Sequence, residues 1–449
     1  MGAYLSKPLK VKDSESSSDD RATYAVTGMQ GWRQYMEDAH VAVPDLALPS
    51  FPEGVSLYGV FDGHGGPAVS MWVSRHIASA LAANLQGVTV PQEKSRLMCA
   101  GDFNNNYGNK EVIDLCEAIQ SCFLRLDDEM SASDAHTELK HLQSVIEADR
   151  TRVMKENDIN PSVQQPLLKA LLQGKRKIDM HEEDGKKYIT VSAMEDEDSD
   201  EEESVDDIKD YEVDMNEDSS ASTAWDPEGC GCTAVVVAHV RGSSPCLVVA
   251  NAGDSRAVAS RKGEAVALTM DHKPMQSREL ARIKAAGGTV NCGRVDGNLN
   301  LSRSLGDLFY KKDLAIPARD QRISAYPDVT VTPLQKDDDF VILACDGIWD
   351  CQSNQDAVDF VRSRLTEYRE AKPPPADHEV LTRICEEMCD ACVADTPFET
   401  EGGVGCDNMT MMVVLLNHEN DDGRGKEVFY YGTPSECEEY VRVCSELME

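Results

Sequence analysis

Apolar positions along the chain fall into two kinds of run. Short, unbroken apolar runs, such as Val55–Phe61, predict buried strands, whereas apolar residues recurring every three or four positions predict helices. The predicted strands are Thr23–Thr27, Val55–Phe61, Thr233–Val240, Cys246–Ala252, Arg256–Ala259, Ala265–Leu268, Phe340–Cys345 and Met409–Leu416. The predicted helices are 67–86, 112–130, Ser277–Ala286, 354–366 and 378–393. This mixed order favours an α+β layered domain over strict βαβ alternation.

The pattern changes between about residues 131 and 224. Residues 195–218 hold fifteen Asp or Glu and one Lys. Like charges repel and little here is apolar, so we expect a long, largely disordered acidic insertion. The expected organisation is an N-terminal segment 1–21, a first globular part 22–130, the insert 131–224, a second globular part 225–418 and a C-terminal tail 419–449.

The net charge narrows the class of partner. The 449 residues include 44 Lys or Arg and 80 Asp or Glu, a formal charge of −36. Such a chain would repel phosphate backbones, so we expect no direct nucleic-acid binding. Two roles remain for the acidic residues: they can ligate metal ions or bind basic partners. The tract 191–220 is therefore either a solubilising loop or a docking segment for basic proteins.

Targeting features are few. We find no signal peptide and no apolar stretch of transmembrane length, so the fifteen cysteines are expected to be reduced thiols in a cytoplasmic or nuclear protein. The opening Met1–Ser6 has an N-myristoylation pattern with Gly2 as the acceptor, although a coincidental Gly2 explains it equally well. One acyl chain would give only weak, peripheral membrane contact.

Three cysteines have a spacing with two interpretations. Cys385, Cys389 and Cys392 faintly resemble half of a zinc site. They also fall at i, i+4 and i+7 of a predicted helix, which is one apolar face. A free cysteine behaves as a small hydrophobe, and no paired Cys-x-x-Cys occurs elsewhere, so the spacing favours core packing.

The candidate chemistry lies where predicted strands end. Asp62 and Asp346 each follow a strand and precede a Gly, and Asp407 comes just before a strand. Glu37-Asp38 adds two more carboxylates. Several hard oxygen ligands without a His/Cys set indicate Mg²⁺ or Mn²⁺ rather than Zn²⁺. Ordinary Asp-Gly turns are the alternative, but the recurrence of the pattern favours a metal cluster.

Eight motifs in order resemble those of the metal-dependent protein phosphatases, the PPM or type 2C family. They are Gln30–His40, Phe61–Gly66, Gly231–Ala234, Asn251–Arg256, Asp271–Pro274, Leu301–Asp307, Asp346–Asp350 and Asp407–Thr410. The resemblance covers about residues 22–130 and 225–418, and the opening hexapeptide with the acidic insert is most similar to gamma-type members. It implies a β-sandwich of two antiparallel sheets flanked by helices.

The resemblance also implies a two-metal hydrolase of phosphoserine and phosphothreonine in proteins, using Mn²⁺ or Mg²⁺. Asp62 would bridge both ions and the carbonyl of Gly63 would bind one of them. Asp346, Asp407 and, directly or through water, Glu37 would hold the other. A third, weaker ion is implied at Asp254, Asp346 and Asp350.

Three further roles follow from the same resemblance. Asp38 would hold a metal-bound water, Arg33 would bind the substrate phosphate, and His64 would protonate the leaving oxygen. Two other functions stay open: an acidic adaptor for basic proteins with weak or no catalysis, and a phosphatase of small phosphoesters. The substrates would be phosphorylated proteins, and we expect a monomer.

Overall fold

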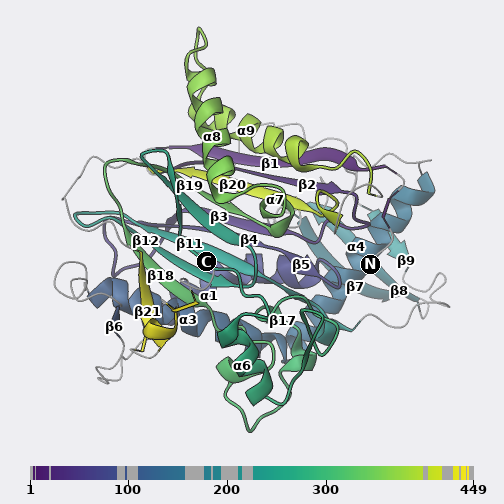
Figure 1. Cartoon of the computed structure of the whole chain (residues 1–449). Coiled ribbons are helices and arrows are strands. Elements are labelled where there is room, and N and C mark those ends of the chain that lie inside the picture. The colour runs from purple at the N-terminus through teal and green to yellow at the C-terminus, as the bar shows by residue number, and fades with distance from the viewer. Residues whose placement is uncertain are drawn as a thin grey trace. The chain divides into compact units, whose positions relative to one another are not determined.

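The computed structural model describes most of the chain (Figure 1). The described residues are 4–5, 7–19, 22–87, 97–98, 110–156, 176–183, 186–193, 211–214, 226–397, 403–416, 428–433, 436–440 and 442–443. They form two compact units. The first combines Met1–Ala135 with Pro227–Glu449, and the second is His136–Asp226.

Two large antiparallel sheets form the first unit. The six-stranded sheet has the order β1-β2-β20-β19-β13-β14, and the seven-stranded sheet has the order β3-β4-β11-β12-β18-β21-β6. The first comprises β1 (Leu9–Ser18), β2 (Thr23–Gly31), β20 (Met409–Leu415), β19 (Asp338–Ala344), β13 (Arg256–Arg261) and β14 (Glu264–Ala267). The second comprises β3 (Ala39–Leu46), β4 (Val55–Phe61), β11 (Ala234–Val240), β12 (Cys246–Ala252), β18 (Asp328–Pro333), β21 (Phe429–Gly432) and β6 (Leu97–Met98).

Both faces of the six-stranded sheet are buried, which explains its unbroken apolar runs. Along β19, Phe340 and Ile342 belong to one core cluster, whereas Val341 and Leu343 belong to another. Successive side chains of a strand point to opposite faces. The second cluster also contains Tyr58 and other residues of the seven-stranded sheet, so it fills the space between the sheets.

Helices cover the outer face of each sheet (Figure 1). Helices α1 (Ala68–Gly87) and α3 (Lys110–Met130) pack against strands of the seven-stranded sheet. Helix α9 (Asp377–Cys392) packs on β1, β2 and β20, beside α8 (Asn354–Arg369) and the short α7 (Asp346–Trp349). Helix α6 (Ser277–Ala285) also belongs to this unit. The predicted α+β sandwich is therefore confirmed.

Two strands extend the sheets beyond the limits 22 and 418 expected from the sequence. Strand β1 pairs with β2 along almost its whole length, and β21 pairs with β18. The residues of β1 are largely polar, so they carry no alternating apolar signal. Backbone pairing and contacts such as Ser14 with Glu386 of α9 hold it at the sheet edge.

The second unit contains most of α4 (Ser133–Glu156) and a small antiparallel sheet. That sheet has the order β7-β8-β9, with bounds Arg176–Glu183, Lys186–Ala193 and Tyr211–Asp214. The insert is thus not wholly without regular structure, because β7 and β8 pair over eight residues each. Apart from β9, the acidic tract 195–218 lies outside the described residues, as does Gly2.

Most described cysteines are free thiols, as expected. Cys385, Cys389 and Cys392 lie buried in the core between α9 and the six-stranded sheet, so core packing is confirmed for them. Cys437 departs from the expectation, because it is disulfide-bonded. None of the described helices is both long and apolar enough to cross a membrane.

Candidate active site

Five aspartates lie at the same end of the sandwich because its strands are antiparallel. Asp62 and Asp346 follow β4 and β19, whereas Asp38 and Asp407 precede β3 and β20. Strands β3 and β4 are neighbours, as are β19 and β20, so the end of one strand meets the start of the next. Asp254 follows β12 at the same edge.

The carboxylates converge closely enough to share a cation. Ligand atoms of Asp62, Asp254 and Asp346 all lie within 4.8 Å of one another, and so do those of Asp38, Asp62 and Cys345. Within the described ranges these are the two such groups. We call Glu37, Asp38, Asp62, Asp254, Asp346, Asp350 and Asp407 the strand-end cluster.

Burial and mutual repulsion disfavour the charged forms of these acids. Burial, then the neighbouring charges of Asp346 and Asp38, raises the pKa of Asp62 well above its usual range. Burial raises the pKa of Asp38 to about 7, although the Thr410 hydroxyl donates to its Oδ2. The pKa of Asp346 is also raised well above its usual range, by burial and by Asp254. Nearby positive charge would relieve this repulsion.

Two glycines let the backbone close around the cluster. A Cβ on Gly63 would lie 2.2 Å from the carbonyl oxygen of Glu37, and one on Gly347 would lie 1.9 Å from that of Asn408. Real Cβ atoms do not approach backbone this closely, so both positions require glycine. The crowding places Glu37 beside Gly63, where the resemblance puts metal ligands.

Asn408 fastens the loop that carries Arg33 and Glu37. Its Oδ1 accepts a hydrogen bond from the Glu37 N–H at 2.8 Å, and its Nδ2 donates to the carbonyls of Gln30 and Tyr35 at 2.8 and 2.9 Å. Glu37 in turn accepts from the Gly66 N–H through Oε1 at 2.7 Å. One amide side chain therefore ties the β20 start to the β2–β3 loop.

Two cations touch the strand-end cluster. Arg33 Nη2 donates to Asp407 Oδ2, and Arg33 keeps part of its guanidinium exposed. Lys273 Nζ lies 2.5 Å from Oδ2 of Asp254, whose side chain is buried. Seven carboxylates thus face two ion-paired cations. The predicted phosphate ligand Arg33 and the predicted metal ligand Asp407 are direct partners here.

His64 is held by a carboxylate that is not among the predicted metal ligands. Its Nε2 lies 2.9 Å from both oxygens of Asp307, which also accepts from the Ser304 hydroxyl. Burial alone would lower the pKa of His64, but Asp307 outweighs it and raises that pKa. The pKa of Asp307 is lowered, because His64 offsets the effect of burial on this carboxyl.

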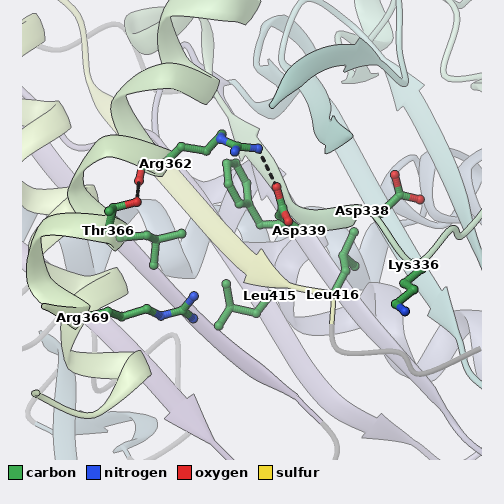
Figure 2. A pocket seen from close by; sticks show the side chains of 10 residues that line it. Lys336, Asp338, Asp339, Arg362, Thr366, Arg369, Leu415 and Leu416 are labelled. Atoms are coloured by element: carbon green, nitrogen blue, oxygen red, sulfur yellow. Dashed lines mark hydrogen bonds and ion pairs between the residues drawn. The ribbon is translucent and has the colours of Figure 1, made fainter. Parts of the chain in front are cut away.

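A cavity of about 360 Å³ lies at the opposite end of β19 and β20 (Figure 2). Arg362 and Arg369 of α8 line one side, and Leu415 and Leu416 lie between them and Lys336. No residue of the strand-end cluster contributes to it. The strand-end cluster and this cavity are therefore separate features.

Comparisons with known proteins agree with this geometry. The family model described as Protein phosphatase 2C matches residues 22–149 and 171–397. Probable protein phosphatase 2C 11 of Oryza sativa subsp. japonica is 34% identical over 414 residues, which are 92% of this chain and 90% of that protein. Protein phosphatase 2C homolog 2 of Schizosaccharomyces pombe is 32% identical, over 96% of this chain and 81% of that protein.

The chain belongs to the protein phosphatase 2C family. It is a protein serine/threonine phosphatase. Solved structures agree on the fold. A phosphatase from a pathogenic strain of Toxoplasma gondii superposes with a TM-score of 0.52 at 18% identity, covering 94% of this chain and all of that one. A Caenorhabditis elegans sex-determining protein gives 0.51 at 20% identity, covering 89% and 66%.

The donor set of this phosphatase fits hard divalent cations. The ligands are mainly carboxylate oxygens, and the buried Asp38 Oδ1 has no hydrogen-bond partner. An orphaned buried oxygen in a negative cluster is costly unless a cation or water satisfies it. Asp350 experiences the same negative electrostatic potential. Burial and the charges of Asp254 and Asp407 raise its pKa, although the nearby Lys273 opposes this shift.

Sequence reasoning missed several residues that position this site. Asp307, Asn408, Thr410 and Lys273 all belong to the recognised motifs, but no role was assigned to them. Cys345 was also missed, and its buried thiol accepts from the Thr410 N–H at 3.1 Å. Their positions could have indicated such a role, because each of the others lies within three residues of a predicted ligand or of another carboxylate in the motifs. Asp307 is the exception, because it is far from His64 in the sequence.

Proposed function

We propose that this phosphatase hydrolyses phosphoserine and phosphothreonine in proteins with two divalent cations, Mn²⁺ or Mg²⁺, at the strand-end cluster. The supporting observation is the excess of clustered carboxylates over cations there. Asp62 and the Gly63 carbonyl would hold one ion, and Asp62, Asp346, Asp407 and Glu37 would hold the other. When bound, the pair of ions would activate water and offset phosphate charge.

The chain's own side chains supply the remaining roles. Arg33 uses one nitrogen on Asp407, and its other N–H groups remain to bind phosphate oxygens. Because Asp307 engages Nε2 of His64, the proton for the leaving oxygen would come from Nδ1. Asp38 has one oxygen fixed by Thr410 and the other unpaired, which suits it to orient a water.

A third, weaker ion is proposed at Asp254, Asp346 and Asp350. Ligand atoms of Asp254 and Asp346 already lie within 4.8 Å of each other and of Asp62. Lys273 occupies one oxygen of Asp254. An ion bound there would have to share Asp254 with this ammonium group, which supports the lower affinity.

The function is tested by phosphate release from a phosphothreonine peptide. Turnover should require Mn²⁺ or Mg²⁺, stop in EDTA and fall by at least about a hundredfold in Asp62→Asn. A matched control is Asp337→Asn, which removes an exposed carboxylate paired with Lys262. Turnover that survives EDTA, or equal losses in the two variants, would contradict the proposal.

We also infer that the chain is a gamma-type member whose tract 191–220 docks basic proteins. The support is the tract's charge together with the opening hexapeptide. Deleting 191–220 should leave peptide turnover nearly unchanged and slow dephosphorylation of basic phosphoproteins such as histones. Equal loss on both substrates would show that the tract only supports the fold.

A further inference from the structure

Two cysteines meet beside the strand-end cluster. Cys351 directly follows Asp350, just after α7, and Cys392 is the last residue of α9. Helices α7 and α9 pack against each other. Both cysteines carry free thiols. Sequence spacing grouped Cys392 with other cysteines of α9, and the tertiary structure instead pairs it with Cys351.

The contact between the two residues is direct. Cys351 Sγ donates to the carbonyl oxygen of Cys392 at 3.5 Å, and Gln352 Nε2 lies 4.0 Å from Cys392 Sγ. Cys351 donates in addition to the carbonyl of Gly347, at 3.5 Å.

The pair differs from the other cysteines of the same core. Cys385, Cys389 and Cys406 are essentially inaccessible, with exposed fractions of 0, 0 and 1%. Cys351 is only partly buried, and its thiol contacts the backbone of Cys392, whose exposed fraction is 6%. Reagents that oxidise thiols act on accessible sulfur first. A partly exposed thiol in contact with a second cysteine is an arrangement that favours disulfide formation.

We propose that Cys351 and Cys392 are a modification site that hydroperoxides convert into a disulfide. The peroxide O–O bond breaks as one oxygen passes to Cys351 sulfur, giving a sulfenic acid and an alcohol, or water from hydrogen peroxide. Cys392 sulfur then attacks; the S–S bond forms, the S–O bond breaks and water leaves with the remaining thiol proton. Two thiols lose two electrons, which the peroxide accepts.

The disulfide should change the neighbouring carboxylates. An S–S bond is only about 2.05 Å long, and Cys351 Sγ contacts the carbonyl oxygen of Cys392 rather than its sulfur, so Cys351 must move to form the bond. Asp350 is its chain neighbour, and Asp346 lies on α7, whose Gly347 carbonyl loses its bond from Cys351. Divalent-cation binding should weaken by roughly tenfold, the lower end of what displaced supporting groups cost. This consequence rests on the proposed metal site.

The test treats the full chain with hydrogen peroxide and blocks remaining thiols with N-ethylmaleimide. Trypsin should then release peptide 337–362 joined to peptide 384–424, and chymotryptic cleavage after Trp349 would separate Cys345 from Cys351. Cys351→Ser should lack the linkage, whereas Cys292→Ser, which removes an exposed cysteine, should keep it. Mn²⁺ binding is measured by electron paramagnetic resonance before oxidation, after it and after dithiothreitol.

We expect weaker Mn²⁺ binding only in the linked proteins, with recovery on reduction. Absence of the linked peptides, or the same linkage in Cys351→Ser, would overturn the proposal that Cys351 and Cys392 form a disulfide. Linkage with unchanged Mn²⁺ binding would overturn its coupling to the site. A reduced protein that binds no Mn²⁺ would instead contradict the proposed function, and the peptide linkage would still decide the thiol pair.

Discussion

The molecule contains two groups of clustered carboxylates that differ in how their charge is balanced. The strand-end cluster has seven acids and two ion-paired cations. The second group, which we call the arginine-paired cluster, has two acids, Glu279 and Asp328, among three arginines. Those arginines are Arg278, Arg282 and Arg303.

The two clusters shift carboxyl pKa values in opposite directions. Burial alone would raise the pKa of Glu279, but Arg282 and Arg303 hold it well below its usual range. Arg278 and Arg303 do the same for Asp328. In the strand-end cluster, burial and like charges raise the pKa of Asp62 instead. The arginines thus make one group a structural ion-pair network, whereas the carboxylates of the other group lack enough cations to balance them.

The largest effect should come from breaking the arginine-paired cluster. Arg303 donates to Glu279 at 2.7 Å and to Asp328 at 3.0 Å, and it is buried. Arg303→Met should lower the free energy of unfolding by about 3–5 kcal/mol, because it leaves buried carboxylates short of a partner. Urea unfolding measures this. Arg362→Met, which removes a surface pair with Asp339, should cost less than about 1 kcal/mol. Similar losses in both would contradict the distinction.

His64 with Asp307 is a balanced pair within reach of the strand-end cluster, and it should matter for turnover. His64→Gln should slow release from phosphothreonine peptides by roughly a hundredfold, because alkoxide leaving groups need a proton. Aryl phosphates have better leaving groups and should be slowed much less. His76→Gln, which changes a histidine stacked on Trp72, is the control. A uniform loss across leaving groups would exclude the general-acid role.

Removing an acid from the strand-end cluster should stabilise the cation-free protein. Asp346→Asn relieves repulsion with Asp254 and Asp62, so its free energy of unfolding in EDTA should rise by about 1–3 kcal/mol. The same variant should gain much less stability from added Mn²⁺ than the wild type. Thermal melts with and without Mn²⁺ measure both. Destabilisation in EDTA would indicate that the carboxylate is a structural group.

A smaller effect should appear in the pH dependence of stability in EDTA. The pKa of Asp38 is about 7 in the folded protein and about 3.9 when unfolded. Between these values the folded state holds the extra proton, so this contribution is complete below pH 4 and is lost as pH rises through 7. It should lower stability by about 1.4 kcal/mol per unit from pH 5 to 7. Asp38→Asn should flatten that slope, and an unchanged slope would contradict the assignment.

Much of the fold could be predicted because buried strands and helices have a recognisable pattern of apolar residues in the local sequence. Val55–Phe61 and Cys246–Ala252 coincide with β4 and β12, since central strands buried on both faces need unbroken apolar runs. Strand β1 has no such pattern, because its polar residues are held by pairing with β2 and by contacts with α9. Edge strands depend on a neighbour that local sequence does not reveal.

The sequence by itself determined which carboxylates stand at strand ends beside glycines, and the recognised motifs proposed their roles. Only the tertiary structure decided their partners: Arg33 with Asp407, His64 with Asp307, and Cys351 with Cys392. It also decided which buried acids meet arginines and which meet one another. The reason is physical: periodicity reflects which residues are buried locally, whereas charge balance depends on groups that the fold brings together from distant positions in the chain.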